Sequence, residues 1–386
     1  MPIARAGEDA PVRVYARPVR WIGVTSLTLI AVLAAGSLAT SGGGAATPSS
    51  ADRRSLEAVV AAGSPGALVL VDRGGSRRQE AAGLAELRGS VPLRAGYRFR
   101  AGSITKTFVA VLVLQLVAEK KLGLADTVER WLPGLVPNGD RITVRQLLAH
   151  TSGLADYAGD SAFLRRTVSE PRRRWTPREL VGVAVGQGPV ARPGERFAYA
   201  STNYVLLGLI VERATGTTVE RQLRRRIFTP LHLTDTSFSA GTEVPGRHAH
   251  GYAPSQHDGI VGSLAAARDR STASASWGWA AGAIVSTAPD LSRFFATLLQ
   301  GRLLPARLLA LMRPSEGARY GLGLAAFRTP CGTAIGHTGN LLGTVSAVWN
   351  SRDGRRRVVA MTNSYPLSPA ADTAFRRLLE TVFCGT

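Results

Sequence analysis

An almost entirely apolar helix is the feature that most constrains how this chain can fold. From Phe108 to Ala118 the only polar residue is Gln115, and the helical pattern begins at Ser103 and ends near residues 120–123. A helix that is apolar on every side belongs in the interior of a protein, because none of its faces suits water. The apolar run is also too short to cross a bilayer, which takes about 20 residues. The sequence therefore predicts a central helix inside a large folded domain.

A serine and a lysine stand at the start of this helix. Ser103 and Lys106 are three residues apart, so their side chains share one helical face. Only three of the 47 basic residues are lysines, and this one lies at the mouth of the apolar helix, where burial would lower the pKa of its amine. An uncharged amine there could take the proton of the serine and make it a nucleophile. The alternative is a helix-capping serine beside a lysine whose amine reaches solvent.

The first 46 residues are predicted to direct the chain out of the cytoplasm. Arginines in residues 1–20 precede an uncharged apolar run from Trp21 to about Thr40, and a stretch of small residues follows. This order is typical of a cleaved secretory signal. The alternative is an uncleaved membrane anchor, because the run has nearly the length of a spanning helix. Both interpretations place residues 47–386, one folded domain, outside the cytoplasm, either secreted or at the cell envelope.

The charge of the chain suits an exported protein. The formal net charge is +20, and the arginines are scattered without interleaved aromatic residues. Nucleic-acid binding is therefore not expected, whereas attraction to anionic cell-envelope polymers is; plain solvated faces are the alternative. No cofactor or metal is predicted, since the histidines at 248, 250 and 257 lie in one expected surface loop (241–276) and zinc needs three or four converging ligands.

The predicted location outside the cytoplasm also bears on the two cysteines. Cys331 and Cys384 are the only cysteines in the chain. An oxidising environment favours a disulfide between them, which would connect a late strand to the C-terminal end of the chain. Two unrelated buried thiols are the alternative.

The order of expected elements predicts an α+β fold. Short β-type runs occur early, at about 66–72 and 78–86, and late, at about 320–327, 333–337, 342–350 and 356–362. The turn at 351–354 signals a hairpin, and a last helix is expected over about 368–383. Residues from about 124 to 300 are predicted to be mainly helical. Asp126 and Thr143 are expected to cap helices, and a helix at 203–215 is expected to end at Gly216. We expect one antiparallel sheet of early and late strands packed with helices, plus a mainly helical second lobe.

Several segments in a fixed order resemble the penicillin-recognising serine hydrolases, which include class C β-lactamases and D-alanyl-D-alanine carboxypeptidases. The resemblance covers roughly residues 55–386, and its order is far more specific than any one segment. The matching segments are Ser103 to Lys106, the stretches 122–126 and 131–133, the helix-to-loop segment 145–154, the segment 197–208 around Tyr199, and Gly336 to Gly339.

The resemblance implies a role for each matching position. Ser103 would be the nucleophile, while Lys106 and Tyr199 would move protons. The oxyanion would lie between two backbone N–H groups, those of Ser103 and Asn340. Tyr204 is interpreted as core packing and His150 as a structural residue that holds a loop.

The third segment is expected to contact the substrate. His337, Thr338 and Gly339 are placed on an edge strand that faces the nucleophile. Thr338 would bind a substrate carboxylate, and His337 would supply positive potential. Related carboxypeptidases also use an arginine on the preceding strand, and here only Arg328 is near. Trp277 is expected either to wall the substrate pocket or, as readily, to pack in the core, and the same holds for Trp279.

Position 201 departs from the resembled family. The family segment usually reads Tyr-x-Asn, but here it runs from Tyr199 to Ser201. An asparagine offers a substrate amide both a donor and an acceptor, whereas serine offers one shorter hydroxyl. Ser201 is still expected to contact substrate, or else to cap the following helix. The departure puts peptide and β-lactam turnover in doubt more than acylation.

The sequence therefore predicts an exported serine hydrolase that forms an acyl-enzyme on Ser103. D-alanyl-D-alanine carboxypeptidase activity on peptidoglycan peptides is the first expectation, β-lactamase activity the second and esterase activity on small esters the third. The competing hypothesis is a penicillin-binding sensor or wall anchor that acylates slowly and does not turn over.

Overall fold

The computed structural model describes residues 50–253, 256–257, 260–261 and 267–385, which belong to one compact unit, Ala45–Thr386. The predicted export segment, 1–46, lies outside the described residues. Within the described ranges, no helix combines the length and the apolar character needed to cross a membrane.

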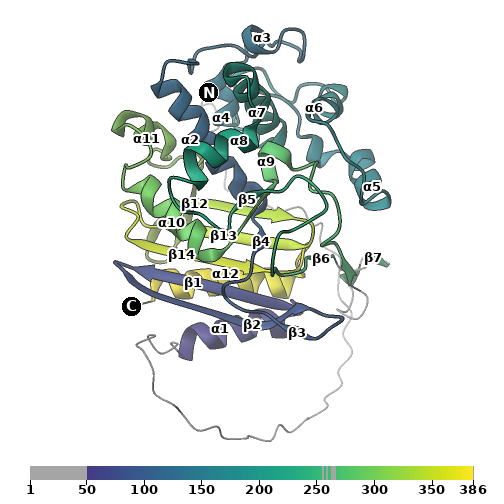
Figure 1. Ribbon diagram of the computed structural model, residues 1–386, viewed down its shortest axis with the longest axis vertical. Coiled ribbons are helices and arrows are strands. Elements are labelled where there is room, and N and C mark those ends of the chain that lie inside the picture. The colour runs from purple at the N-terminus through teal and green to yellow at the C-terminus, as the bar shows by residue number, and fades with distance from the viewer. Residues whose placement is uncertain (1–49, 254–255, 258–259, 262–266, 386) are drawn as a thin grey trace, which may run out of the picture. The chain divides into compact units, whose positions relative to one another are not determined.

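A seven-stranded antiparallel sheet forms the base of the fold (Figure 1). Its early strands pair with its late strands, because β1 lies between β2 and β14 in register, Val69 opposite both Glu80 and Ala360. The prediction of an antiparallel sheet from both ends of the chain is confirmed. In spatial order the strands are β11 (Ala325–Thr329), β12 (Gly332–Leu341), β13 (Thr344–Asn350), β14 (Arg356–Thr362), β1 (Gly66–Arg73), β2 (Ser76–Glu86) and β3 (Val91–Pro92).

Helices cover both faces of this sheet. Alternate residues of a strand point to opposite faces, and β1 is buried from Gly66 to Asp72. Val69 packs in one apolar cluster and Leu70 in the other. The helices α1 (Ser50–Ala61) and α12 (Pro369–Cys384) pack against each other and cover one face. On the opposite face, α10 (Ala288–Leu299) packs on β1 and β14.

The remaining elements lie mostly between β3 and β11 and are mainly helical, as predicted. The helical segments are η1 (Gly102–Ile104), α2 (Thr105–Ala118), α3 (Val128–Trp131), α4 (Val144–Leu148), η2 (Tyr157–Gly159), α5 (Ser161–Ser169), α6 (Pro177–Gly186), α7 (Ser201–Thr215), α8 (Val219–Leu223), η3 (Arg224–Phe228), α9 (Trp279–Gly282) and α11 (Ala306–Met312). The short strands are β4 (Phe99–Arg100), β5 (Ser237–Phe238), β6 (Tyr252–Ala253), β7 (Gln256–His257), β8 (Ile260–Val261), β9 (Arg268–Asp269) and β10 (Ile284–Ser286).

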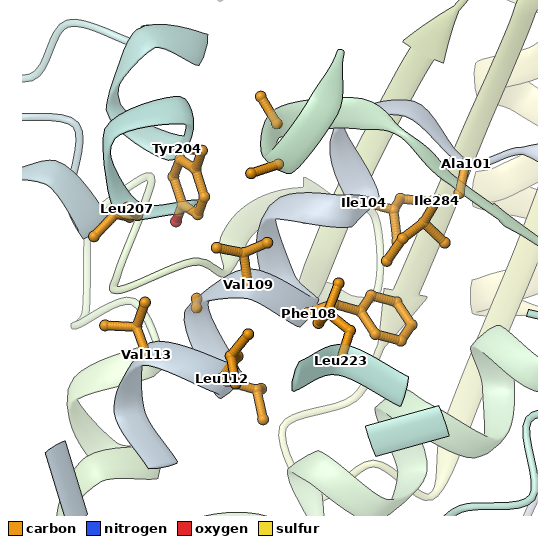
Figure 2. Packing of buried hydrophobic residues seen from close by; sticks show 14 of the residues in the cluster. Ala101, Ile104, Phe108, Val109, Leu112, Val113, Tyr204, Leu207, Leu223 and Ile284 are labelled. Carbon is orange, nitrogen blue, oxygen red and sulfur yellow. The ribbon is translucent and has the colours of Figure 1, made fainter. Parts of the chain in front are cut away.

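The apolar helix is central, as its composition predicted. In α2 every residue from Thr105 to Leu114 is buried, and its side chains extend to different sides of the helix (Figure 2). Phe108 stacks on Phe294 of α10 with ring centroids 3.6 Å apart and meets Phe228 edge to face. Burying a large apolar side chain contributes about 1.5–3 kcal/mol, so the packing of this helix on α10 and on α7, α8 and α9 stabilises the fold.

Helix ends were predicted with mixed success. Thr143 caps α4 in a reciprocal capping box with Gln146, and Gly216 ends α7 with a left-handed φ of 66°. The prediction that Asp126 caps the next helix is wrong: Thr127 accepts the capping hydrogen bond, and Asp126 instead accepts from Gly123 N and Trp131 Nε1.

The predicted disulfide is present. Cys331, in the turn between β11 and β12, is bonded to Cys384 at the end of α12, with Cα atoms 5.5 Å apart. Cross-links of this kind typically contribute about 2–4 kcal/mol, mainly by restricting the unfolded chain. This one fastens the last helix to the outer edge of the sheet.

Candidate active site

Two glycines let the start of the apolar helix meet the backbone of β12. Gly102 has φ +54°, and a Cβ on it would lie 2.6 Å from Asn340 N. A Cβ on Gly339 would lie 2.0 Å from Ala101 O and 2.9 Å from Ser103 N. Only residues without a side chain permit this approach. As a result, the backbone N–H groups of Ser103 and Asn340 lie at the same junction.

The strand at this junction has one unpaired edge. β12 is the second strand of the sheet rather than the edge strand that was predicted, and β11 pairs with it only as far as Gly336. Beyond that point β12 pairs with β13 on one side, through Leu341. His337 is buried and Thr338 is exposed. The backbone around Thr338 is therefore unpaired on the side of β11, which is the property of an edge strand that the prediction relied on.

Lys106 lies wholly inside the protein and contacts Ser103. Its Nζ donates to Ser103 Oγ at 2.8 Å and to the carbonyl of Ala281 at 3.0 Å, and none of its surface is exposed. Burial lowers the pKa of the amine from 10.5 to about 7, and the charge of Asp156 opposes that shift. Near neutral pH a large fraction of Lys106 is therefore uncharged and within reach of the serine proton.

Tyr199 approaches the serine from the other side. Its ring lies 5.0 Å from Lys106 Nζ. The residue keeps 39% of its surface exposed, yet desolvation around the phenol raises its pKa well above the ordinary value, and an interaction with the Ser103 side chain only partly offsets this. Tyr199 is therefore a neutral phenol in the resting site.

Ser201 joins this cluster as the first residue of α7. The cap position of α7 belongs to Ala200, so the prediction of a Ser201 cap is wrong. Lys106 Nζ donates to Ser201 Oγ at 3.5 Å, and Ser201 N donates to Asp156 Oδ1 at 3.0 Å. Sequence reasoning missed the role of Asp156, although it lies only two residues beyond the matched 145–154 segment.

His337 does not supply the positive potential that was expected of it. Its Nδ1 lies 2.6 Å from Thr338 O and its Nε2 lies 2.9 Å from the hydroxyl of Tyr320. Burial, together with the charge of Lys106, lowers its pKa to about 3. A neutral ring donates through Nδ1 and accepts at Nε2. His337 therefore shapes the strand and holds Tyr320, a second residue that the motifs did not indicate.

A buried polar layer supports Tyr199 and the start of α7. His150 stacks on Tyr199 with ring centroids 4.2 Å apart, and its Nδ1 accepts from Ala200 N at 3.2 Å. Asn203 accepts from Ser152 Oγ at 2.6 Å, and Tyr204 donates to Leu148 O at 3.1 Å. The interpretations of His150 as structural and of Tyr204 as core packing agree with these contacts.

Two further residues are not brought into the site as expected. Arg328 is exposed and pairs in register with Thr333, at the far end of β12 from Thr338. Trp277 is half-buried against the core, where its ring meets Phe163 edge to face, so the packing alternative describes it better than the pocket wall. No group of three or more histidine, cysteine or acidic side chains in the described ranges could hold a metal ion.

The family of the chain follows from comparison with known proteins. The model of the family described as Beta-lactamase matches residues 53–383. The chain belongs to the beta-lactamase family. Both the resemblance seen in the sequence and the predicted α+β class are thereby confirmed, with the serine hydrolase fold that this family carries.

Solved structures of the beta-lactamase fold are similar to most of this chain. A D-stereospecific amidohydrolase from Streptomyces sp. is 35% identical, with a TM-score of 0.78 over 88% of this chain and 100% of that one. D-amino acid amidase from Ochrobactrum anthropi SV3, complexed with L-phenylalanine, is 27% identical, with a TM-score of 0.75 over 86% and 98% of the two chains.

Among curated proteins, penicillin-binding protein 4* of Bacillus subtilis (strain 168) is 27% identical over 73% of this chain. Protein flp of Staphylococcus aureus (strain N315) is 30% identical over 49% of it. The matches span 64% and 38% of these two relatives, less than two thirds of their own length.

Proposed function

We propose that this member of the beta-lactamase family hydrolyses amide bonds through an acyl-enzyme on Ser103. One observation carries the proposal: the fully buried amine of Lys106 lies 2.8 Å from Ser103 Oγ, and its pKa is lowered to about 7. A serine attacks efficiently when an adjacent base removes its proton, and general bases work best when their pKa is near the working pH.

In the acylation step that we propose, Lys106 Nζ takes the proton of Ser103 while Oγ bonds to the carbonyl carbon. The carbonyl oxygen becomes an oxyanion between the N–H groups of Ser103 and Asn340, whose donors are fixed in place beforehand. The Tyr199 phenol gives its proton to the leaving nitrogen as the C–N bond breaks, and Lys106 returns a proton to Tyr199. In deacylation, water attacks the acyl carbon while Lys106 takes its proton, the bond from that carbon to Ser103 Oγ breaks, and Ser103 regains the proton as the acid leaves.

The substrates that we propose are small amides or peptides of D-amino acids. This choice is supported by the similarity to the D-stereospecific amidohydrolase from Streptomyces sp. and the D-amino acid amidase from Ochrobactrum anthropi SV3. The position of Arg328 agrees with it, because a carboxypeptidase needs a cation for the terminal carboxylate, and this arginine lies at the far end of β12.

D-alanyl-D-alanine carboxypeptidase activity is the second candidate. The similarity to penicillin-binding protein 4* favours it, as does exposed Thr338 beside the unpaired edge of β12. We propose further that the chain works outside the cytoplasm, on the strength of its N-terminal sequence. Peptidoglycan peptides and β-lactams then become the natural compounds to try.

A substrate panel tests these proposals. It comprises a D-amino acid amide, its L-enantiomer, a D-Ala-D-Ala peptide, a chromogenic cephalosporin and a small ester. We expect the highest kcat/KM for the D-amide, with the L-enantiomer much slower. Preference for the D-Ala-D-Ala peptide would replace the first candidate by the second. A permanent adduct without turnover of any compound would mean a sensor rather than an enzyme.

A further inference from the structure

At position 201 this chain has a serine in place of the family's usual asparagine, and the carboxylate of Asp156 contacts that serine. Asp156 is in the loop between α4 and η2, and its Oδ1 accepts the backbone N–H groups of Ala158 at 3.1 Å and Ser201 at 3.0 Å. These two bonds fix the carboxylate in place. Desolvation raises the pKa of this carboxyl, while the charge of Lys106 and the interactions with Ala158 and Ser201 oppose that shift.

Ser201 lies between this carboxylate and the lysine. Lys106 Nζ lies 3.5 Å from Ser201 Oγ, and only 9% of the surface of Ser201 is exposed. A hydroxyl can accept from an amine and at the same time donate its one proton to a carboxylate. Ser201 therefore lies between Lys106 and Asp156: its hydroxyl accepts from the amine, and its backbone N–H donates to the carboxylate.

Such a chain matters because Lys106 must change its charge during the reaction. It begins as an amine, and it becomes an ammonium in a dry site when it takes the proton of Ser103. Burial disfavours that ammonium, whereas a carboxylate nearby favours it. In a water-poor site this attraction is stronger than it would be in solvent.

We propose that Asp156 is a positioning residue that acts through Ser201 to orient Lys106 and to stabilise the ammonium formed when Ser103 is acylated. The proposal rests on the function proposed above. It also gives the departure at position 201 a role, because Ser201 contacts the lysine through its hydroxyl and the carboxylate through its backbone N–H.

The other ionisable groups around Lys106 do not duplicate this role. His150, from the end of α4, and His337, on β12, are both buried and neutral, because desolvation lowers their pKa values. The phenols of Tyr199 and Tyr204 have raised pKa values and are neutral as well. On α9, the amine of Lys106 has one hydrogen-bond partner, the backbone carbonyl of Ala281, which carries no net charge. On the side of Asp156, the neighbouring phenol of Tyr157 is likewise neutral.

The test is the pH dependence of Ser103 acylation in the full-length protein with the variant Asp156→Asn. An asparagine can still accept from Ala158 N and Ser201 N, so it removes the charge and keeps the backbone contacts. We measure the rate of acylation by a small activated ester from pH 5 to 9. In the wild type we expect the rate to rise with pH with a midpoint of about 7, where Lys106 loses its proton.

In Asp156→Asn we expect the midpoint to fall by about one to two pH units, because the ammonium has lost its carboxylate. The rate at high pH should fall roughly 10-fold, less than the ~100-fold or more that losing the general base itself would cause. Ser201→Ala should shift the midpoint in the same direction, and Asp156→Glu should restore it towards the wild-type value.

The control is Asp140→Asn, which makes the same charge change at an exposed position and should leave the profile unchanged. If the midpoint in folded Asp156→Asn equals that of the wild type, or moves equally in Asp140→Asn, the role of Asp156 is refuted. If the wild type itself is never acylated on Ser103, the proposed function fails instead, so the two failures are distinguishable.

Discussion

Tyr199 combines a structural and a chemical contact in one side chain. Its ring stacks on buried His150, while its phenol interacts with the Ser103 side chain, which lowers the pKa of the phenol. Tyr199→Phe keeps the ring and removes only the hydroxyl. We therefore expect an unchanged Tm and a kcat lower by roughly 10²–10⁴, the usual contribution of a proton-transferring group.

The matched control for this prediction is Tyr204→Phe. That hydroxyl donates to Leu148 O deep in the core, so its loss should reduce stability by about 1 kcal/mol and leave kcat within severalfold of the wild type. Steady-state kinetics and thermal unfolding of both variants give the comparison. Near-normal turnover in Tyr199→Phe would remove this phenol from the proposed proton path.

At the residue scale, the sequence motifs predicted which side chains form the site but not the charge state of each one. The spacing of Ser103 and Lys106 and the apolar helix behind them were enough to predict their contact. The positive charge expected of His337 was wrong, because its burial and its partner Tyr320 come from segments distant in sequence. Asp156 was missed for a related reason: its significance depends on the folded loop that places it behind Ser201.

At the scale of elements, the contact between η1 and β12 sets the geometry of the site. A methyl group on Gly339 would overlap Ala101 O, so Gly339→Ala should push β12 away and separate the N–H groups of Ser103 and Asn340. Removing one oxyanion donor typically costs about 10²–10³ in kcat. We expect a loss of that size in a variant that circular dichroism shows to be folded.

Gly182→Ala provides the control for that substitution. Gly182 lies on the exposed side of α6, with no atom within 4 Å of a Cβ built there. Alanine at that helical position should raise stability by up to about 1 kcal/mol and leave kcat unchanged. Full activity in Gly339→Ala would contradict the assignment of this junction as the oxyanion site.

Elements with a strong local pattern were predicted well. The apolar helix, the hairpin between β13 and β14 and the stop at Gly216 each follow from a few adjacent residues. The late strands were less accurate: β11 begins at Ala325 rather than near 320, and β12 continues to Leu341. Those boundaries depend on which strand pairs with which, a matter of tertiary contact that the local sequence does not contain.

At the scale of the whole molecule, a sheet built from both ends of the chain and a mainly helical segment hold the site between them. α2 packs against α7 and α9 on one side, while η1 contacts β12 on the other. The ordered series of motifs predicted this architecture and the family. It did not separate amide hydrolysis from carboxypeptidase activity, because that choice depends on where a few charged side chains lie after folding.

The central claim is that an uncharged Lys106 activates Ser103, and intact-mass measurement of adduct formation tests it most directly. The wild-type protein is treated with a fluorophosphonate at a series of pH values, and the modified peptide is mapped. The amine gains reactivity as it loses its proton, so we predict one adduct, on Ser103, whose rate of formation rises through pH ~7. Ser103→Ala should remain unmodified. An adduct on another residue, or a rate on Ser103 that does not change between pH 5 and 9, would contradict the account.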